Sequence, residues 1–278
     1  ALTLNTTPLS VADVFTKQIE DNARAWIFTS ATLSVKGDFS HYRSQLGLIN
    51  SASESWDSPF DYGNQAMFYL PSNMPEPNTP GYTKAVVDTA LPLLVASGGR
   101  AFLLFTSLRA MKEARALLEV EFERDQISYP ILMQGERSRT ELLEQFRSLG
   151  NAVLLGSQSF WEGVDVKGDA LSLVIIDKLP FAPPDDPVLS ARIQQINESG
   201  GNAFMEYQLP HAVITLKQGA GRLIRDETDR GVLVICDPRL VSKPYGRRIW
   251  QSLPPMKRSR DAAEVVTFLQ QMQATPGT

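Results

Sequence analysis

The stretch Leu173-Val174-Ile175-Ile176-Asp177-Lys178 decides the fold of this chain. Four consecutive apolar residues are typical of a buried strand, and charged residues follow directly at its end. The run Ala152-Val153-Leu154-Leu155 has the same character. Because neither run alternates between apolar and polar residues, we expect both strands to be buried on both faces, as in a parallel sheet covered by helices.

Outward from these strands, the pattern alternates between helix and strand. The expected order is helix 82–97, strand 101–105, helix 108–122, strand 129–133, helix 137–149, strand 152–156, strand 171–176, helices near 187–198 and 202–218, strand 231–236, and a helix near 261–273. This order predicts an α/β fold in which a mostly parallel sheet lies between two layers of helices.

The first eighty residues are less regular. Residues 10–22 are expected to form an amphipathic helix capped by Ser10, and residues 26–30 a strand. In the proline-rich connection that follows, only residues 66–70 have the pattern of a strand. Near the other end of the chain, Lys257-Arg258-Ser259-Arg260 is interpreted as a solvated surface turn.

The composition excludes several classes of protein. The 278 residues are 43% hydrophobic and 21% charged, which is typical of a globular chain with a sizeable core. A net charge of −4 argues against a protein that coats nucleic acid with its whole surface, so any DNA contact is expected in a local groove. The single cysteine, Cys236, excludes an internal disulfide and a four-cysteine metal site. Only two histidines are present, far apart in sequence, which predicts no metal site built from this chain.

The ends of the chain suggest its context. No signal peptide opens it, and no apolar run approaches the ~18 residues needed to cross a bilayer, which predicts a cytoplasmic protein. The chain begins at Ala1 and runs directly into patterned sequence. We therefore expect a piece of a longer protein.

The strongest chemical signal is the stretch Gln218-Gly219-Ala220-Gly221-Arg222-Leu223-Ile224-Arg225. It is expected to place two arginines on one helical face, beside glycines that let another surface approach the backbone. Guanidinium groups in such an arrangement suit a phosphoryl-transfer site, where they neutralise developing charge. The alternative is a salt-bridged helix end that involves Asp226, Glu227 and Asp229. The sequence contains neither a G-x-x-x-x-G-K-[ST] loop nor an acidic Walker B box, so it holds only part of such a site.

Polar residues gather where the predicted strands end, which is the edge at which open α/β sheets bind ligands. Thr106 and Ser107 either cap the helix that follows them or contact a nucleic-acid phosphate. Trp161 and Phe181 are either core residues or platforms on which bases stack. Near Trp161, the acidic residues of the segment 156–165 either close a turn or belong to a functional loop.

Together these segments resemble the C-terminal motor domain of a superfamily 2 helicase, of the branch that contains XPD and the bacterial DinG-like proteins. The segments that carry the resemblance are Thr29 to Leu33 (motif III), Leu103 to Ser107 (motif IV), Gly156 to Asp165 with Leu179 to Phe181 (motif V), and Gln218 to Arg225 with Asp229-x-Gly231 (motif VI). Their order and spacing extend over nearly the whole chain.

The resemblance implies a RecA-like three-layer αβα domain, the second motor domain of a helicase. It also implies an ATP-driven motor that moves 5′→3′ along single-stranded DNA and unwinds duplexes or forks during repair and replication. Arg222 and Arg225 would reach the phosphates of ATP, with Arg225 as the arginine finger, and Gln218 would sense the nucleotide. The further cofactor-binding residues that it implies are Glu162, Gly163, Asp165 and Gly221.

The same resemblance assigns residues to DNA and to coupling. The DNA contacts that it implies are Ser107, Gln134, Ser159, Trp161 and Lys178. Ser30 and Thr32 would couple hydrolysis to domain closure. Residues 1–35 are expected to be a bridging segment that carries motif III, and residues 36–278 the C-terminal RecA-like domain.

The family's remaining parts are missing from this chain. ATP and Mg²⁺ would be bound mainly by the first RecA-like domain of the same polypeptide, and the family's iron–sulfur cluster has no cysteines here. We therefore expect no ATPase activity from the chain alone. The resemblance also suggests a replication partner, the χ subunit of the clamp loader. The alternative function is a catalytically silent RecA-like module that docks a replication or repair partner.

Overall fold

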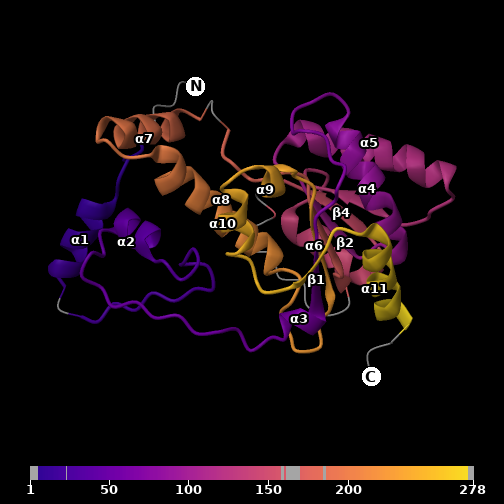
Figure 1. Ribbon diagram of the computed structural model, residues 1–278, viewed down its shortest axis with the longest axis horizontal. Helices are drawn as coiled ribbons and strands as arrows, with labels where there is room; N and C mark the ends of the chain where they lie inside the picture. Colours follow the sequence, from indigo (N-terminus) through magenta and orange to yellow (C-terminus); the bar gives the residue numbers. More distant parts are fainter. Residues whose placement is uncertain (1–5, 23, 158–159, 161–169, 184–185, 275–278) are drawn as a thin grey trace. The chain divides into compact units, whose positions relative to one another are not determined.

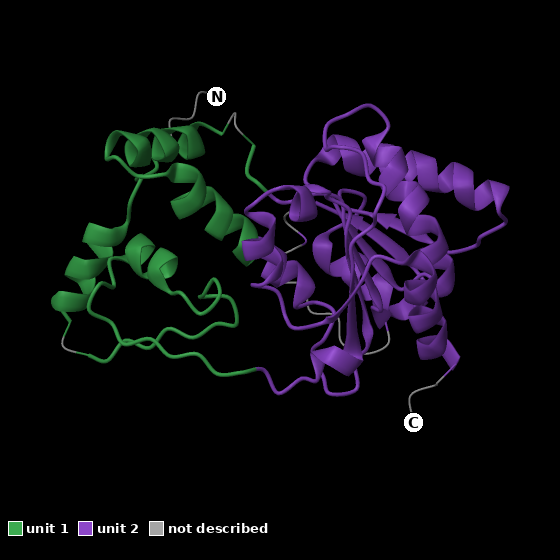
Figure 2. Cartoon of the chain, in the orientation of Figure 1, with its two compact units in different colours: residues 1–57, 181–214 green, residues 58–180, 215–278 purple. Residues whose placement is uncertain are grey.

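The computed structural model describes residues 6–22, 24–157, 160, 170–183 and 186–274. The chain divides into two compact units, which Figure 2 shows in green and purple. The first unit consists of residues 1–57 and 181–214, and the second of residues 58–180 and 215–278. Each unit is described by itself.

The second unit contains a parallel sheet. Its seven described strands are β1 (Ala66–Tyr69), β2 (Ala101–Leu104), β3 (Ile131–Met133), β4 (Val153–Gly156), β5 (Leu173–Ile176), β6 (Gly231–Ile235) and β7 (Lys257–Ser259). Their order is β3-β4-β2-β5-β6-β1-β7, and each neighbouring pair runs parallel. The prediction of a parallel sheet with continuously buried strands is confirmed, since β2, β4, β5 and β6 are buried along their whole length.

Helices cover both faces of this sheet (Figure 1). One face packs against α4 (Tyr82–Ala96), α5 (Leu108–Arg124) and α11 (Ala262–Ala274), and Leu103 of β2 belongs to that core. Because side chains alternate along a strand, Phe102 points to the opposite face. There its ring centroid lies 4.8 Å from that of Phe146 in α6 (Arg139–Leu149). The predicted RecA-like three-layer αβα architecture is confirmed.

Strand β7 contradicts the interpretation of Lys257-Arg258-Ser259-Arg260 as a surface turn. Lys257–Ser259 form the edge strand of the sheet, with Tyr69 paired to Ser259 in a parallel register. The segment has the composition of a solvated turn because an edge strand tolerates charged side chains; Lys257 and Arg258 are exposed, and Ser259 is buried.

The first unit contains helices joined by irregular segments in its described parts. It contains α1 (Ala12–Glu20), α2 (Ser40–Leu46), α7 (Pro187–Glu198), the π-helical turn η3 (Phe204–Gln208) and the start of α8 (Leu209–Ala220). The predicted helix 10–22 is confirmed with narrower bounds. The predicted cap Ser10 is wrong, because Val11 is the N-cap residue and makes no side-chain capping bond. Ser10 lies one residue earlier, where its Oγ accepts a hydrogen bond from the N–H of Ala12 at 3.2 Å.

The predicted strand 26–30 is wrong. These residues are extended, but no described strand pairs with them, so their side chains make the contacts instead. The rings of Trp26 and Phe28 stack with centroids 6.4 Å apart, and Phe15 of α1 lies 5.8 Å from Phe28. Apolar residues in an extended chain therefore serve an aromatic cluster rather than a sheet.

The predicted helix 202–218 begins with the π-helical turn η3 and continues as α8. The irregularity has a local cause at Pro210, which lacks the N–H that an α-helix would donate to the carbonyl of Glu206. That carbonyl oxygen instead lies 3.0 Å from Nδ1 of His41. His41 therefore replaces a backbone hydrogen bond that the sequence makes impossible.

Three further short helices, α3 (Tyr62–Gln65), α9 (Arg239–Ser242) and α10 (Gly246–Trp250), were not predicted. Each has no more than five residues, which is too short for the spacing of apolar residues to reveal a helical period. All three lie in the second unit, where α3 directly precedes β1 and the other two follow β6.

Candidate functional site

The arginine motif lies where helix α8 ends. The helix stops at Ala220, Arg222 lies in the turn that follows, and Arg225 lies in the next loop. The prediction that both arginines share one helical face is therefore wrong. The reason is that Leu223 and Ile224 are 2% and 3% exposed, so the chain leaves the helix in order to bury them.

The loop after the motif is held by two side chains. Oδ2 of Asp229 accepts hydrogen bonds from the backbone N–H groups of Arg225 at 2.8 Å and of Asp226 at 2.9 Å. Gln65, at the end of α3, lies on the same loop, with its Nε2 3.0 Å from the carbonyl oxygens of Asp226, Glu227 and Asp229. Asp229 and Gln65 thus fix the backbone that carries Arg225.

Gly231 explains the last position of the motif. A Cβ atom at this residue would lie 2.7 Å from the carbonyl oxygen of Ser172 and closer still to Cδ1 of Leu223. Only glycine lets Leu223 pack over the start of β6 at this distance. The two residues of the Asp229-x-Gly231 pair therefore have different roles. Asp229 accepts hydrogen bonds from the loop backbone, and Gly231 leaves room for the side chain of Leu223.

Gln218 is the motif residue that stays in the helix. Its Oε1 is buried and has no hydrogen-bond partner among the described residues. A buried acceptor without a donor costs about 1–3 kcal/mol, so the hydrogen bonding of Gln218 is incomplete within the described residues.

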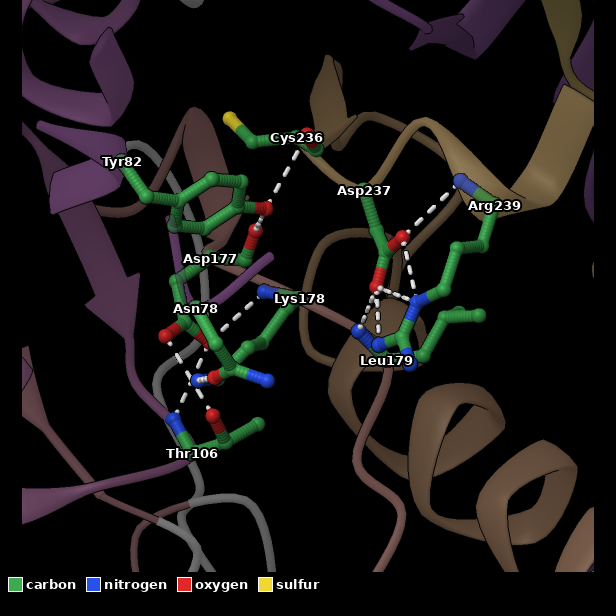
Figure 3. A network of polar contacts seen from close by, with 9 residues as sticks. All are labelled: Asn78, Tyr82, Thr106, Asp177, Lys178, Leu179, Cys236, Asp237 and Arg239. Atoms are coloured by element: carbon green, nitrogen blue, oxygen red, sulfur yellow. Dashed lines mark hydrogen bonds and ion pairs between the residues drawn. The ribbon is translucent and has the colours of Figure 1, made fainter. Parts of the chain in front are cut away.

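A second polar centre lies at the carboxyl ends of β2 and β5 (Figure 3). Asp177 follows β5 and is almost completely buried, and its carboxylate accepts hydrogen bonds from the backbone N–H and the hydroxyl of Thr106 at 3.0 and 3.3 Å. The N–H of Lys178 donates to it at 2.7 Å. Burial raises the pKa of Asp177 to about 7, although these hydrogen bonds act in the opposite direction.

The end of β6 joins the same edge. Asp237 accepts from Arg239, whose Nη2 lies 2.6 Å from Oδ2, and from the N–H of Leu179 at 2.8 Å. The hydroxyl of Tyr82 lies 2.7 Å from the carbonyl oxygen of Asp177, and burial raises the pKa of that hydroxyl strongly. The loops after β2, β5 and β6 are thereby connected through buried carboxylates, as Figure 3 shows.

Three of the predicted DNA-contact residues lie at this edge and already have partners. Ser107 caps α5, since its Oγ accepts from the N–H of Ala110 at 3.2 Å. Oε1 of Gln134 accepts from the N–H of Ser157 at 2.7 Å. Nζ of Lys178 donates to Asn78 at 3.1 Å. The capping alternative is thus confirmed for Ser107, whereas its neighbour Thr106 binds Asp177.

The predicted site residues lie in separate places. The arginine loop lies near the amino ends of β5 and β6, beside Ser172 and Gly231, whereas Ser107, Gln134 and Lys178 follow the carboxyl ends of strands. Ser30 and Thr32 belong to the first unit, where their hydroxyl oxygens lie 3.2 Å apart. The predicted residues Ser159, Trp161, Glu162, Gly163 and Asp165 lie outside the described residues.

The surroundings of Phe181 favour the alternative in which it is a core residue rather than a platform for stacking bases. Its ring centroid lies 5.5 Å from that of Phe204 in the first unit, and the residue is only partly exposed. This contact accounts for one of the two aromatic residues that were considered as stacking platforms.

Comparison with known proteins identifies the family. A family model described as a helicase C-terminal domain matches residues 91–256, which is more than half of the chain. This chain belongs to that family. The match begins within α4 and ends just before β7, so it includes the arginine loop and the buried carboxylates Asp177 and Asp237.

The relatives of this helicase C-terminal domain are of the DinG-like type, as predicted. It is 52% identical to the ATP-dependent DNA helicase YoaA of Escherichia coli (strain K12), over 96% of this chain and 41% of that protein. It is 38% identical to the ATP-dependent helicase DinG of Mycobacterium tuberculosis (strain ATCC 25618 / H37Rv), over 97% and 40%. The chain spans about two fifths of the length of these relatives.

Solved structures of XPD proteins share the fold of the helicase C-terminal domain. The structure described as XPD_APO has a TM-score of 0.55 at 21% identity, over 71% of this chain and 40% of that one. The structure of S. tokodaii Xpd4 has a TM-score of 0.51 at 14% identity, over 75% and 41%. These similarities support the XPD-like architecture.

Two residues of the helicase C-terminal domain that hold the site were not predicted. Gln65 lies in the irregular proline-rich connection, and no sequence signal linked it to a loop that begins 161 positions later. Asp177 was noticed as a strand-end residue, but not as a buried carboxylate. Its position directly after a fully buried strand, together with a Thr at the end of the neighbouring strand, is the signal that could have indicated the contact.

The described part of the helicase C-terminal domain shows no group of three or more His, Cys, Asp and Glu side chains that could hold a metal ion. Cys236 is fully buried, and burial raises the pKa of its thiol. None of the described helices is both long and apolar enough to pass through a membrane.

Proposed function

We propose that this chain is the second motor domain of an ATP-dependent DNA helicase that moves 5′→3′ and acts in DNA repair and replication. Arg225 is its arginine finger, and Arg222 neutralises phosphate charge beside it. The observation that carries the proposal is the arginine loop itself, whose backbone is fixed by Asp229 and Gln65 directly after Gln218 and helix α8. The relatives named as ATP-dependent helicases support it.

The residues present fit one side of an ATP site. Arg222 and Arg225 offer guanidinium groups for phosphates, and the buried Oε1 of Gln218 offers an acceptor for a donor from outside the chain. ATP, with Mg²⁺, supplies the free energy of phosphoryl transfer when it is bound. Because this sequence has no phosphate loop, the first RecA-like domain of the same polypeptide would hold most of the nucleotide.

On the DNA side, we propose that the strand-end residues Ser107, Gln134 and Lys178 line the path of a single strand. Their present partners in this chain, Ala110, Ser157 and Asn78, hold these side chains at the carboxyl edge of the sheet. Ser159 and Trp161 complete the proposed DNA contacts. Glu162, Gly163 and Asp165 would connect this path to the ATP site, together with Gly221.

The remaining parts of the proposal concern the parent protein. Residues 1–35 would bridge the two motor domains and carry the coupling residues Ser30 and Thr32, which bind each other in the first unit. The iron–sulfur cluster would belong to the part of the parent protein outside this chain. The χ subunit of the clamp loader is a proposed partner on the basis of the resemblance alone.

The test is the ATPase activity of the full-length parent, stimulated by single-stranded DNA, with Arg225→Ala compared with wild type. An arginine finger contributes about 10³–10⁵ in kcat, so we expect a loss of at least about a hundredfold with DNA binding retained. The matched control is Arg124→Ala, which removes an exposed arginine from the end of α5. Unchanged turnover in Arg225→Ala would remove the arginine finger from the proposal. If the wild-type parent shows no DNA-stimulated turnover, the silent docking module becomes the better explanation.

A further inference from the structure

A pocket of about 550 Å³ lies in the second unit. Its walls come from α9, α10 and the residues between them, together with the ends of β1 and β7. None of the predicted catalytic, cofactor-binding or DNA-binding residues lines it. We refer to it as the β7 groove.

The charge of the β7 groove is one-sided. Lys243, Arg247, Arg258 and Arg260 line it, and no acidic residue does. Within the part of the chain that the structure describes, no carboxylate lies within ion-pair distance of any of these four side chains. The whole chain has a net charge of −4, so this concentration of positive charge is local, and it favours an anionic ligand.

The floor of the β7 groove is apolar. It is formed by Leu70, Leu240, Val241, Pro244 and Trp250. Val241 is 55% exposed, so part of this apolar floor is open to a ligand. A floor of branched side chains, leucine and valine, suits an apolar side chain of the ligand.

Trp250 distinguishes a peptide from a nucleic acid. The guanidinium of Arg258 lies over the Trp250 ring at 4.1 Å from its centroid. That face of the indole is therefore occupied by a cation–π contact and is not open to a stacking base. The remaining groove surface combines aliphatic residues with cations, which matches acidic side chains that flank an apolar one.

The backbone of β7 adds a further feature. The N–H of Leu70 donates to the carbonyl oxygen of Ser259 at 3.0 Å, so Ser259 directs its backbone toward β1. Because successive residues of a strand direct their backbone groups to opposite sides, Arg258 directs its N–H and C=O away from β1. No described strand pairs with that side of β7. An extended peptide can bind both groups, the N–H as a donor and the C=O as an acceptor.

We infer that the β7 groove binds an extended acidic peptide segment of a partner protein, with one large apolar side chain in the Val241–Trp250 floor and carboxylates on the surrounding Lys and Arg side chains. The site serves docking and is separate from the arginine loop. Its occupancy does not depend on ATP hydrolysis, so the inference and the proposed helicase function fail or succeed independently.

The experiment measures fluorescence anisotropy of a fluorescein-labelled peptide, Asp-Glu-Asp-Leu-Asp-Glu-Phe-Asp, titrated with this 278-residue chain. Two variants change exposed groove residues, Arg247→Glu for the charge and Val241→Asp for the floor. The matched control is Lys112→Glu on α5, which is also exposed and changes the net charge by the same amount as Arg247→Glu. Circular dichroism of each variant checks that the fold is retained.

We expect saturable binding that weakens at least about tenfold in Arg247→Glu and in Val241→Asp, and less than about twofold in Lys112→Glu. A peptide with Ser in place of Leu and Phe should also bind at least about tenfold more weakly. Equal binding by that peptide, no saturable binding, or equal losses in Lys112→Glu would overturn the inference. If oligo-dT displaces the peptide and loses affinity in Arg247→Glu but not in Val241→Asp, the groove binds nucleic acid instead.

Discussion

At the scale of single residues, Asp177 is a buried carboxylate whose pKa is raised by its surroundings. Its carboxylate directly follows a fully buried strand and accepts hydrogen bonds from the N–H groups of Thr106 and Lys178. Its hydrogen bonds favour the charged form, but burial dominates and raises the pKa to about 7. The same residue thus joins two strand-end loops and makes that junction sensitive to pH.

The expected consequence is a stability that falls as the pH rises. Folding raises the pKa of Asp177 from 3.8 to about 7, so the folded state binds the proton more tightly than the unfolded state. The resulting stabilisation is complete below about pH 4 and is lost as the pH rises through about 7. Urea unfolding measures this effect. Between pH 5 and pH 8, the free energy of unfolding of wild type should fall by on the order of 2–3 kcal/mol relative to that of Asp177→Asn, which cannot ionise. Parallel pH dependences of the two proteins would contradict this account.

Sequence reasoning at this scale identified residue types better than their contacts. The arginine motif and its glycine were recognised as a pattern, whereas the reasons for the pattern needed coordinates: Asp229 binds two backbone N–H groups, and Gly231 leaves room for Leu223. Gln65 could not be found, because the loop that it binds is far away in sequence.

At the scale of elements, local periodicity was sufficient where helices and strands are long and buried. Helix 108–122 and strand 101–105 were predicted with nearly the bounds that the structure shows, Leu108–Arg124 and Ala101–Leu104. The predicted strand at residues 26–30 and the predicted turn at residues 257–260 were both wrong. Whether such a segment joins a sheet depends on a partner strand. For β7 that partner is β1, almost two hundred residues earlier.

The connection between α8 and β6 gives a prediction at this scale. Gly231→Ala places a Cβ against the Ser172 carbonyl and Leu223, so we expect a loss of about 1–3 kcal/mol in unfolding free energy. Displacement of Leu223 should also move Arg222, and DNA-stimulated ATPase of the full-length parent should fall. Thermal unfolding and turnover of the same preparation measure both effects.

Gly63→Ala is the control for this prediction. Gly63 lies in helix α3, where a Cβ would meet only Oδ1 of Asp61 at 3.6 Å. Because alanine is favoured over glycine inside a helix by about 1 kcal/mol, this variant should be neutral or more stable. If Gly231→Ala were as well tolerated as Gly63→Ala, the packing of Leu223 would not be what requires glycine.

At the scale of the whole molecule, the chain carries the arginine loop that we propose for a phosphate site, but its sequence contains no phosphate loop. We therefore predict no measurable Mg²⁺-dependent ATP hydrolysis by the 278-residue chain under conditions in which the full-length parent is active. An arginine finger accelerates the reaction only where metal and phosphates are already positioned. Hydrolysis by the pure chain that disappears in Arg225→Ala would disprove this prediction.

The strand order has a consequence for synthesis on the ribosome. Of the seven described strands, β1 is made first, yet its two neighbours in the sheet are β6 and β7, the last two. At 5–20 residues per second, β1 waits on the order of 10 s after its own emergence before Gly231 leaves the tunnel. During that interval its apolar residues Met67 and Phe68 have no strand to pair with, so the nascent chain is a natural client for a chaperone until its C-terminal part arrives.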